Sequence, residues 1–202
     1  MFCATDKFVQ EYGEVRYIGL CDQQLSREKI IMVTANINDV NLEAVSELVN
    51  KIKESPENAA TQWRAEVNWK GGFRSDAKIR DFEPVTSDEP PGLGGSDSGP
   101  NPVEQFLGAL GNCLAVGYAA NASIAGVTIN DLRIEVEGDV DLHTFLGLAQ
   151  GNAGYEDIRV KVHLDCDGTE EQVQTIHKNV VSTSPVGHSV SRAVPLNIEL
   201  AE

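Results

Sequence analysis

A cysteine near the middle of the chain is the residue best suited to nucleophilic or redox chemistry. Cys113 lies in a run of small residues whose apolar spacing predicts a helix, in register with Phe106 and Leu110. A thiolate there could attack an electrophilic oxygen or sulfur. The alternative is a buried thiol that packs as a small hydrophobe, the commoner fate of a lone helical cysteine. Because Cys113 lies about three turns into the predicted helix, the helix dipole is too distant to favour the thiolate, and a cation must come from another element.

The other cysteines and the histidines show no metal-binding pattern. No two cysteines are separated by two residues, which excludes a zinc knuckle and a thioredoxin-type pair. His143, His163 and His177 have no ligand spacing, so we expect no metal and no bound cofactor. Buried or incidental thiols are expected at Cys3, Cys21 and Cys166.

The helix that carries Cys113 has clear start and stop signals. Asn101 is a good N-cap, Pro102 suits the first helical position, and Gly126 suits the residue after the end. Half of the residues in 108–125 are Gly or Ala. We therefore expect other backbones to approach this helix closely and to bury it on nearly all sides.

Outside the helix that carries Cys113, the sequence between residues 61 and 202 predicts mostly strands. Gly71-Gly72 predicts a hairpin turn, and Thr169 with Gln172 forms a capping box that opens a second helix, which ends near Ser184-Pro185. The Gly- and Pro-rich stretch 86–102 predicts a long functional loop. Alternation of apolar and polar residues predicts half-buried strands at 63–69, 73–79, 132–142, 158–164 and 194–200. This order predicts an α+β fold, with antiparallel sheets and two central helices on one face.

The first 60 residues are expected to form an extension to a main domain at 61–202. Runs at 13–20 and 30–35 are weakly strand-like, and apolar spacing predicts a helix near 41–54.

Charge and composition exclude several classes of protein. The chain carries 31 acidic and 16 basic residues, a formal net charge of −15. This balance argues against nucleic acid and against an anionic membrane surface as partners. No apolar run approaches the roughly 20 residues that span a bilayer, and no signal peptide is apparent. A cytoplasmic protein with reduced thiols is the expectation.

Five segments of the sequence resemble the OsmC/Ohr family. The most specific is Gly99–Ala115, which contains Cys113, and the others are Trp69–Arg74, Ser87–Gly95, Ser184-Pro185-Val186 and Ala193–Leu200. The resemblance covers roughly residues 40–202. It implies an intertwined homodimer with two sites at the subunit interface, and in many members a thiol-dependent peroxidase that reduces organic hydroperoxides.

The resemblance also implies roles for single residues. Cys113 matches the cysteine that is oxidised to sulfenic acid, Glu104 the acid that orients an arginine, and Arg74 that arginine. Arg64 and Arg80 are weaker candidates for the cation. Arg74 would face solvent on a monomer, so it can serve Cys113 only if a partner subunit covers that face. Glu104 is also the residue type that a helix start prefers at its third position.

The sequence departs from the family pattern at the second cysteine. Ser184 stands in that place, and serine cannot form a disulfide. Cys166 could substitute, although plain burial is its simpler role. An external thiol is therefore the expected resolving agent for Cys113. The substrate pocket is expected to include Phe106, Leu110, Ser184 and His188.

The expected function is reduction of organic hydroperoxides through Cys113 with a small thiol or dithiol as reductant. Two alternatives remain open. The chain could be a non-catalytic binding module that retains the interfacial pocket, or a redox sensor in which Cys113 forms a mixed disulfide with a partner protein.

Overall fold

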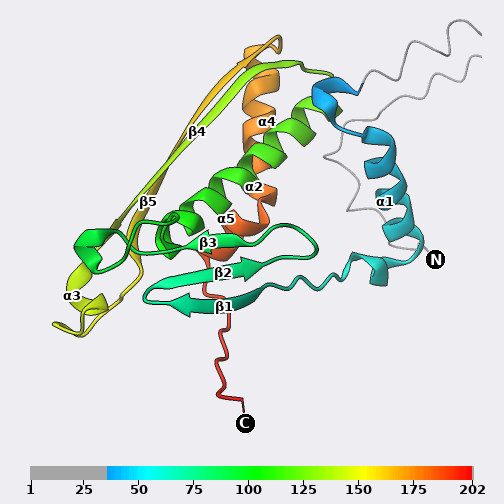
Figure 1. Ribbon diagram of the computed structural model, residues 1–202. Coiled ribbons are helices and arrows are strands. Elements are labelled where there is room, and N and C mark those ends of the chain that lie inside the picture. The colour runs from blue at the N-terminus through cyan, green and yellow to red at the C-terminus, as the bar shows by residue number, and fades with distance from the viewer. Residues whose placement is uncertain (1–35, 202) are drawn as a thin grey trace, which may run out of the picture. The chain divides into compact units, whose positions relative to one another are not determined.

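The computed structural model describes residues 36–201, and these form an α+β fold (Figure 1). The helices are α1 (Leu42–Glu54), α2 (Pro102–Ile124), α3 (Leu142–Phe145), α4 (Glu170–Thr183) and α5 (Pro185–Ser191). The strands are β1 (Glu66–Gly71), β2 (Arg74–Lys78), β3 (Val85–Ser87), β4 (Ile129–Val140) and β5 (Tyr155–Cys166). Short 3-10 turns are η1 (Ile37–Asp39), η2 (Pro56–Ala59) and η3 (Pro91–Leu93).

The strands form two antiparallel sheets. The first has the order β1-β2-β3, and the second is the long β4-β5 hairpin. The predicted hairpin turn at Gly71-Gly72 is confirmed, and both glycines have positive φ, 101° and 61°. Such values are strained for residues with a Cβ. The short β3, at the start of the stretch predicted as a loop, was not predicted.

The core lies where α2 and α4 pack against the β4-β5 hairpin. Gly117 of α2 permits this close packing, because a Cβ there would lie 3.0 Å from a methyl carbon of Val180 on α4. The predicted caps are confirmed: Asn101 with Glu104 and Thr169 with Gln172 both form capping boxes. The buried apolar residues are Leu110, Leu114, Tyr118, Ala122, Val127, Ile176 and Val180.

The expectation that α2 is buried on nearly all sides is wrong for the single chain. Its buried residues follow one face, whereas Val116 is 70% and Ile124 66% exposed. Among residues 36–201, the elements that contact α2 are mainly β4, α4, α5 and η1, and together they do not surround a helix of this length.

The first sheet is also more exposed than its alternation predicts. The strand begins at Glu66, not at residue 63, and Trp69 is 75% exposed. Alternation predicts an apolar face, but in the single chain little covers that face, and Val67 and Phe73 are exposed as well.

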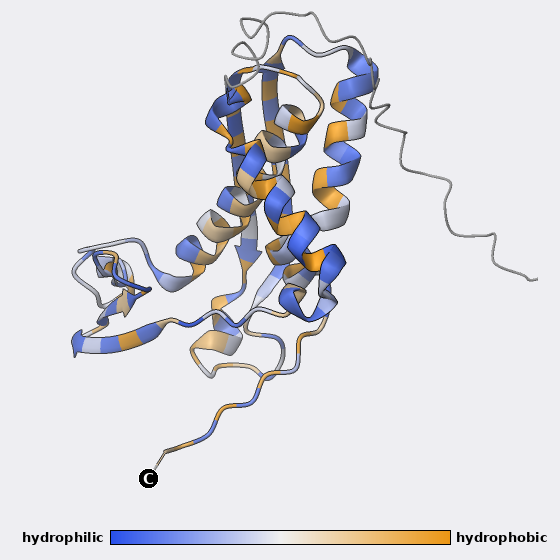
Figure 2. Cartoon of the chain, turned by 90° about the vertical axis from the view of Figure 1, so that its right-hand side faces the viewer, coloured by the Kyte–Doolittle hydropathy of each residue, from blue (hydrophilic) through white to orange (hydrophobic). Residues whose placement is uncertain are grey.

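The predicted strand at 194–200 does not form in the single chain. The segment is extended, and Figure 2 shows its alternating apolar and polar residues. A strand needs hydrogen bonds from a neighbour, and the described residues offer this segment none. Two smaller corrections concern Leu142, which opens α3 where the strand was expected to continue, and α5, which was not predicted.

The predicted helix near 41–54 is confirmed as α1, with Asn41 as its N-cap. The runs at 13–20 and 30–35 lie outside the described residues, and a domain boundary at residue 60 stays a prediction. Within 36–201, no helix has the length and apolarity that crossing a membrane requires.

Asn38 ties η1 to the end of α2. Its side chain donates to Ser123 Oγ (3.1 Å) and to the Val127 carbonyl (3.0 Å), and accepts from the Ile129 N–H (2.8 Å). Its φ of 55° lies in the left-handed region, which asparagine tolerates better than most residues. One side chain thereby fixes the start of β4 relative to η1.

A buried carboxylate organises the loop before α2. Asp88 is 1% exposed and accepts hydrogen bonds from the N–H and hydroxyl groups of Ser96 and Ser98 and from the Glu89 N–H. These bonds, that of the Ser96 hydroxyl above all, hold the pKa of Asp88 well below its usual value, against the effect of burial. The loop that leads into α2 therefore closes around one negative charge.

Candidate active site

The structure brings Cys113 and Ser184 into contact across 71 residues of sequence. Cys113 Sγ on α2 lies 3.2 Å from Ser184 Oγ, at the junction of α4 and α5. Cys113 is half-buried, and Ser184 is 5% exposed. The two positions that the family resemblance pairs are therefore neighbours in space.

The junction of the two helices fixes the Ser184 side chain. Ser184 ends α4, where its N–H donates to the Val180 carbonyl (3.1 Å), and it is the N-cap of α5. Its Oγ accepts a hydrogen bond from the Gly187 N–H (3.1 Å). The hydroxyl proton is therefore free to point to Cys113, and when the sulfur is a thiolate the hydroxyl must be the donor.

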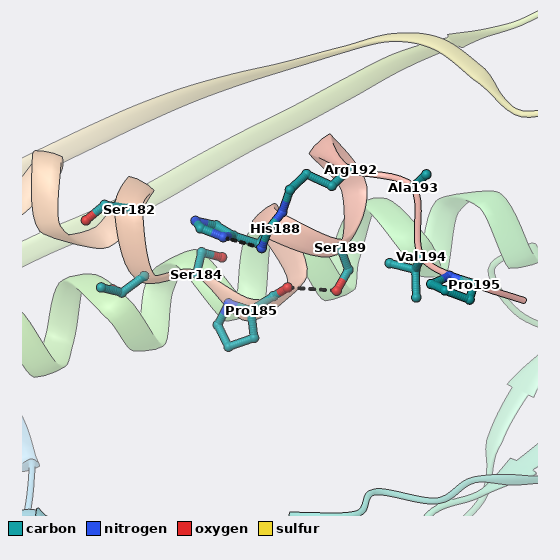
Figure 3. Close-up of a pocket in the computed structure, with 10 residues that line it drawn as sticks. Ser182, Ser184, Pro185, His188, Ser189, Arg192, Ala193, Val194 and Pro195 are labelled. Carbon is teal, nitrogen blue, oxygen red and sulfur yellow. Dashed lines mark hydrogen bonds between the residues drawn. The ribbon is translucent and has the colours of Figure 1, made fainter. Parts of the chain in front are cut away.

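A surface pocket of about 550 Å³ borders this pair on the α5 side (Figure 3). The end of α4, α5 and the segment after it line the pocket, and Ser184 is its one buried lining residue. His188 lines it too, where the sequence analysis places it. Arg192, which the sequence does not single out, donates to His188 Nδ1 at 2.8 Å. If the sequence analysis had predicted a helix at this position, the four-residue spacing of His188 and Arg192 would have placed them one turn apart on the same face.

The other expected pocket residues lie along α2. Leu110 is buried in the core, and Phe106 is partly exposed and stacked on Tyr155 of β5, with ring centroids 6.0 Å apart. The Tyr155 hydroxyl donates to the Val103 carbonyl (2.8 Å). Burial raises the pKa of Tyr155, and the nearby Glu104 charge raises it further. Phe106 and Tyr155 thus form an apolar surface near the start of α2.

Glu104 serves the helix start in the single chain. Its carboxylate accepts from the Asn101 N–H (2.8 Å), while the Asn101 side chain accepts from the Glu104 N–H (2.9 Å). This geometry matches the helix-start role. It does not bring Glu104 into a hydrogen bond with an arginine among residues 36–201.

Arg74 is not brought to Cys113 within one chain. It begins β2, is exposed, and its guanidinium reaches the Lys70 carbonyl at 3.5 Å. Arg64 pairs with Glu66, and Arg80 lies over the Phe82 ring. In the described part of one chain, none of the three is hydrogen-bonded to Cys113.

Cys166 and the remaining histidines lie elsewhere. Cys166 ends β5 opposite Ile129 and packs against the core next to Val127, beyond the far end of α2. His143 contacts Asp141, and His163 contacts Glu135. No metal-binding cluster occurs among residues 36–201.

A second pair of polar groups joins the two central helices. The buried Tyr118 hydroxyl of α2 hydrogen-bonds His177 Nδ1 of α4, and burial raises the pKa of Tyr118. Sequence spacing gave no signal for this pair, because the partners are 59 residues apart.

Comparison with known proteins assigns this chain to a family. Residues 95–199 match the family model described as OsmC-like protein. An uncharacterized protein of Bacillus subtilis (strain 168), YmaD, is 30% identical over 137 residues, which are 66% of this chain and 87% of that protein.

Solved structures agree with the fold. An OsmC-like protein from Mycoplasma pneumoniae aligns with a TM-score of 0.56 at 17% identity, over 65% of this chain and 88% of that one. An OsmC-like protein of unknown function from Vibrio cholerae O1 biovar eltor str. N16961 aligns with a TM-score of 0.51 at 12% identity, over 64% and 94%. From the matched motif, the fold and these relatives, the chain belongs to the OsmC-like protein family.

Proposed function

We propose that this protein is a thiol-dependent peroxidase that reduces organic hydroperoxides through Cys113. The observation that carries the proposal is the 3.2 Å contact between Cys113 Sγ and Ser184 Oγ. In this contact the Ser184 hydroxyl can donate to a Cys113 thiolate, and Ser184 stands at the position where the family pattern has its second cysteine. The family also includes proteins named for organic hydroperoxide resistance.

The first step needs only the thiolate and the peroxide. The Cys113 sulfur attacks one peroxide oxygen, an S–O bond forms, and the O–O bond breaks. The departing alkoxide takes a proton and leaves as an alcohol, and the sulfur becomes a sulfenic acid, oxidised by two electrons. The Ser184 hydroxyl supports this step, because it donates to a sulfur that carries negative charge.

The second step needs thiols from outside the chain. Ser184 cannot form a disulfide, so a thiol attacks the sulfenic sulfur, expels water and forms a mixed disulfide with Cys113. A second thiol group then attacks the incoming sulfur and releases the Cys113 thiolate. Two thiol groups become one disulfide, and no bound cofactor takes part.

The missing cation comes from a second copy of the chain. Arg74 lies on the exposed first sheet, and apolar side chains around it have no cover in the single chain, among them Val67, Trp69 and Phe73. The α2 residues that are exposed and the segment 194–200, which pairs with no strand among residues 36–201, are further surfaces that a partner subunit could cover. An intertwined homodimer would cover these surfaces and bring Arg74 of the partner subunit to Cys113, where a guanidinium would favour the thiolate.

The apolar surface of Phe106 and Tyr155 favours organic peroxides over hydrogen peroxide. A bulky apolar substituent gains binding free energy when it leaves water and packs against these rings, whereas hydrogen peroxide has no apolar part to bury.

The test is consumption of cumene hydroperoxide by the purified protein with dithiothreitol as reductant. We expect turnover that disappears in Cys113→Ser and persists in Cys166→Ser, the matched control. Absence of turnover in the folded wild-type protein would contradict the proposal and would favour a binding module. That alternative rests on Ser184, because loss of the second cysteine removes the internal disulfide step.

A further inference from the structure

The pocket beside Ser184 carries positive charge in a strongly acidic chain. Ten described residues line it, and no Asp or Glu is among them. Its titratable lining groups are Arg192 and His188. In contrast, Arg133 and Arg159 pair with carboxylates of their own sheet, whereas Arg192 has no carboxylate partner within residues 36–201. An arginine on a pocket wall that is paired with no carboxylate of residues 36–201, in a chain with a formal charge of −15, points to an anion from outside.

The hydrogen bonds in the pocket leave two groups of free donors. The hydroxyls of Ser182 and Thr183 both donate to the Asn179 carbonyl, and that of Ser189 donates to the Pro185 carbonyl (Figure 3). These hydroxyl protons are therefore occupied. The side-chain donors that remain belong to Arg192 and His188.

Arg192 and His188 are arranged to donate together. The Arg192 guanidinium can only donate, so His188 Nδ1 accepts in this contact (Figure 3), and Nε2 is the ring nitrogen left to donate. The other guanidinium N–H groups and the Nε2–H have no hydrogen-bond partner among the described residues. A planar guanidinium with a neighbouring N–H donor fits a carboxylate, which accepts two parallel hydrogen bonds.

The same pocket is lined by Ser184, the residue that contacts Cys113. Ser184 is its buried lining residue, and Cys113 Sγ lies one hydrogen bond behind Ser184. A volume of about 550 Å³ suits a small molecule and not a macromolecule. A molecule held by its carboxylate at Arg192 would therefore share a pocket with the side chain that contacts the Cys113 sulfur.

We propose that Arg192 and His188 bind the carboxylate of a small thiol, and that this anionic thiol is the reductant of oxidised Cys113. This inference rests on the proposed peroxidase function and adds the chemical class of its second substrate. The bound thiol attacks the Cys113 sulfenic sulfur, the S–O bond breaks and water leaves. A second molecule then attacks the sulfur of the first, which frees the Cys113 thiolate and yields the disulfide of the reductant.

The test uses thiol exchange at Cys113 and no peroxide. Cys113 is first converted to its S-methyl mixed disulfide with methyl methanethiosulfonate. Release by 3-mercaptopropionate and by 2-mercaptoethanol is then followed by mass spectrometry of the Cys113 peptide. Each rate is divided by the rate of the same thiol on S-methylthiocysteine, which removes the intrinsic difference between the thiols.

We expect the corrected rate to favour 3-mercaptopropionate by about tenfold, as a charge-assisted contact implies, and to saturate with concentration. Arg192→Gln should bring the ratio close to one, and Arg192→Lys should give an intermediate value. Arg133→Gln, an exposed arginine of β4, is the control and should keep the wild-type ratio. A wild-type ratio near one, or a preference that survives Arg192→Gln, would overturn the proposal.

A second measurement does not require Cys113 to react. The His188 ring resonances are followed by NMR during titration with 3-mercaptopropionate, with 2-mercaptoethanol as control. We expect a saturable shift of the His188 resonances with 3-mercaptopropionate and none with 2-mercaptoethanol. Equal shifts with the two thiols would contradict the carboxylate site. If peroxide turnover fails while the exchange preference holds, the carboxylate site stands and the peroxidase proposal falls.

Discussion

At the scale of single residues, Cys113 and Ser184 lie in contact although they are distant in sequence. The pairing of these positions came from motif resemblance, and spacing alone could not give it, because 71 residues separate them. The pattern did predict the helix around Cys113 and its caps, since those signals are local. It could not predict Arg192, whose place depends on the unpredicted α5.

The geometry at Ser184 predicts that a cysteine there restores an internal disulfide. In Ser184→Cys, one equivalent of peroxide should link residues 113 and 184, because the present side-chain atoms are already 3.2 Å apart. Intact-mass and peptide mapping without added thiol would detect the link. Ser182→Cys, on the exposed side of the same helix end, is the matched control and should remain unlinked. An unlinked Ser184→Cys protein would show that the two positions do not meet in solution.

The Asp88 carboxylate predicts a specific pH dependence. Its pKa is lowered in the folded state, so the ionised group stabilises the fold above the ordinary carboxyl pKa, and this contribution is lost as pH falls below it. Asp88→Asn should lower the melting temperature at neutral pH and flatten its decline below about pH 4. Thermal unfolding across pH would measure this. The exposed neighbour Asp97→Asn is the control, and identical profiles for both variants would contradict a role for Asp88.

At the scale of elements, prediction succeeded where a segment carries its own pattern. The strands β4 and β5 show alternating periodicity, the helices α1, α2 and α4 show helical periodicity together with capping residues, and all five are present. Prediction failed where a neighbouring strand is required: the 194–200 segment alternates like a strand but has no strand to pair with in the part of the chain that the structure describes. The α5 segment, with its Gly187 and short length, carries too little periodicity to predict a helix.

Asn38 links two elements, and its removal should be costly. Asn38→Ala leaves the Ile129 N–H without its acceptor and places a residue that disfavours positive φ in the left-handed region. We expect the free energy of unfolding to fall by about 1–3 kcal/mol, the usual cost of unsatisfied buried groups. Urea denaturation would measure it. Asn36→Ala is the control, because the Asn36 side chain makes no capping hydrogen bond and should change little. Equal effects would mean that the tie contributes nothing.

At the scale of the whole molecule, the exposed apolar surfaces predict association. Leu196 is 80% exposed in a segment whose alternation is that of a half-buried strand. A strand of this kind gains hydrogen bonds and apolar burial when a second chain covers it. The dimer stays part of the proposed function, and it alone would bring Arg74 to the thiol.

Two neighbouring substitutions test the association. Leu196→Lys should shift the protein from dimer to monomer in analytical ultracentrifugation, since a charge would replace an apolar contact. Asn197→Lys, on the opposite face of the same segment, adds the same charge and should leave the dimer intact. A monomeric wild-type protein, or equal behaviour of the two variants, would remove the basis for a shared site.

The hydroxyl at position 184 has a consequence for how long each oxidised molecule persists. In a chain with two cysteines, the second cysteine converts the sulfenic acid to a disulfide at an intramolecular rate that does not depend on the external thiol concentration. With a hydroxyl in that place, the proposed cycle has no intramolecular step of this kind, and Cys113 stays oxidised until an external thiol reacts with it. The oxidised fraction then settles where peroxide encounters and thiol encounters balance. The fraction of molecules oxidised at Cys113 would therefore follow the ratio of peroxide to thiol in the surrounding solution.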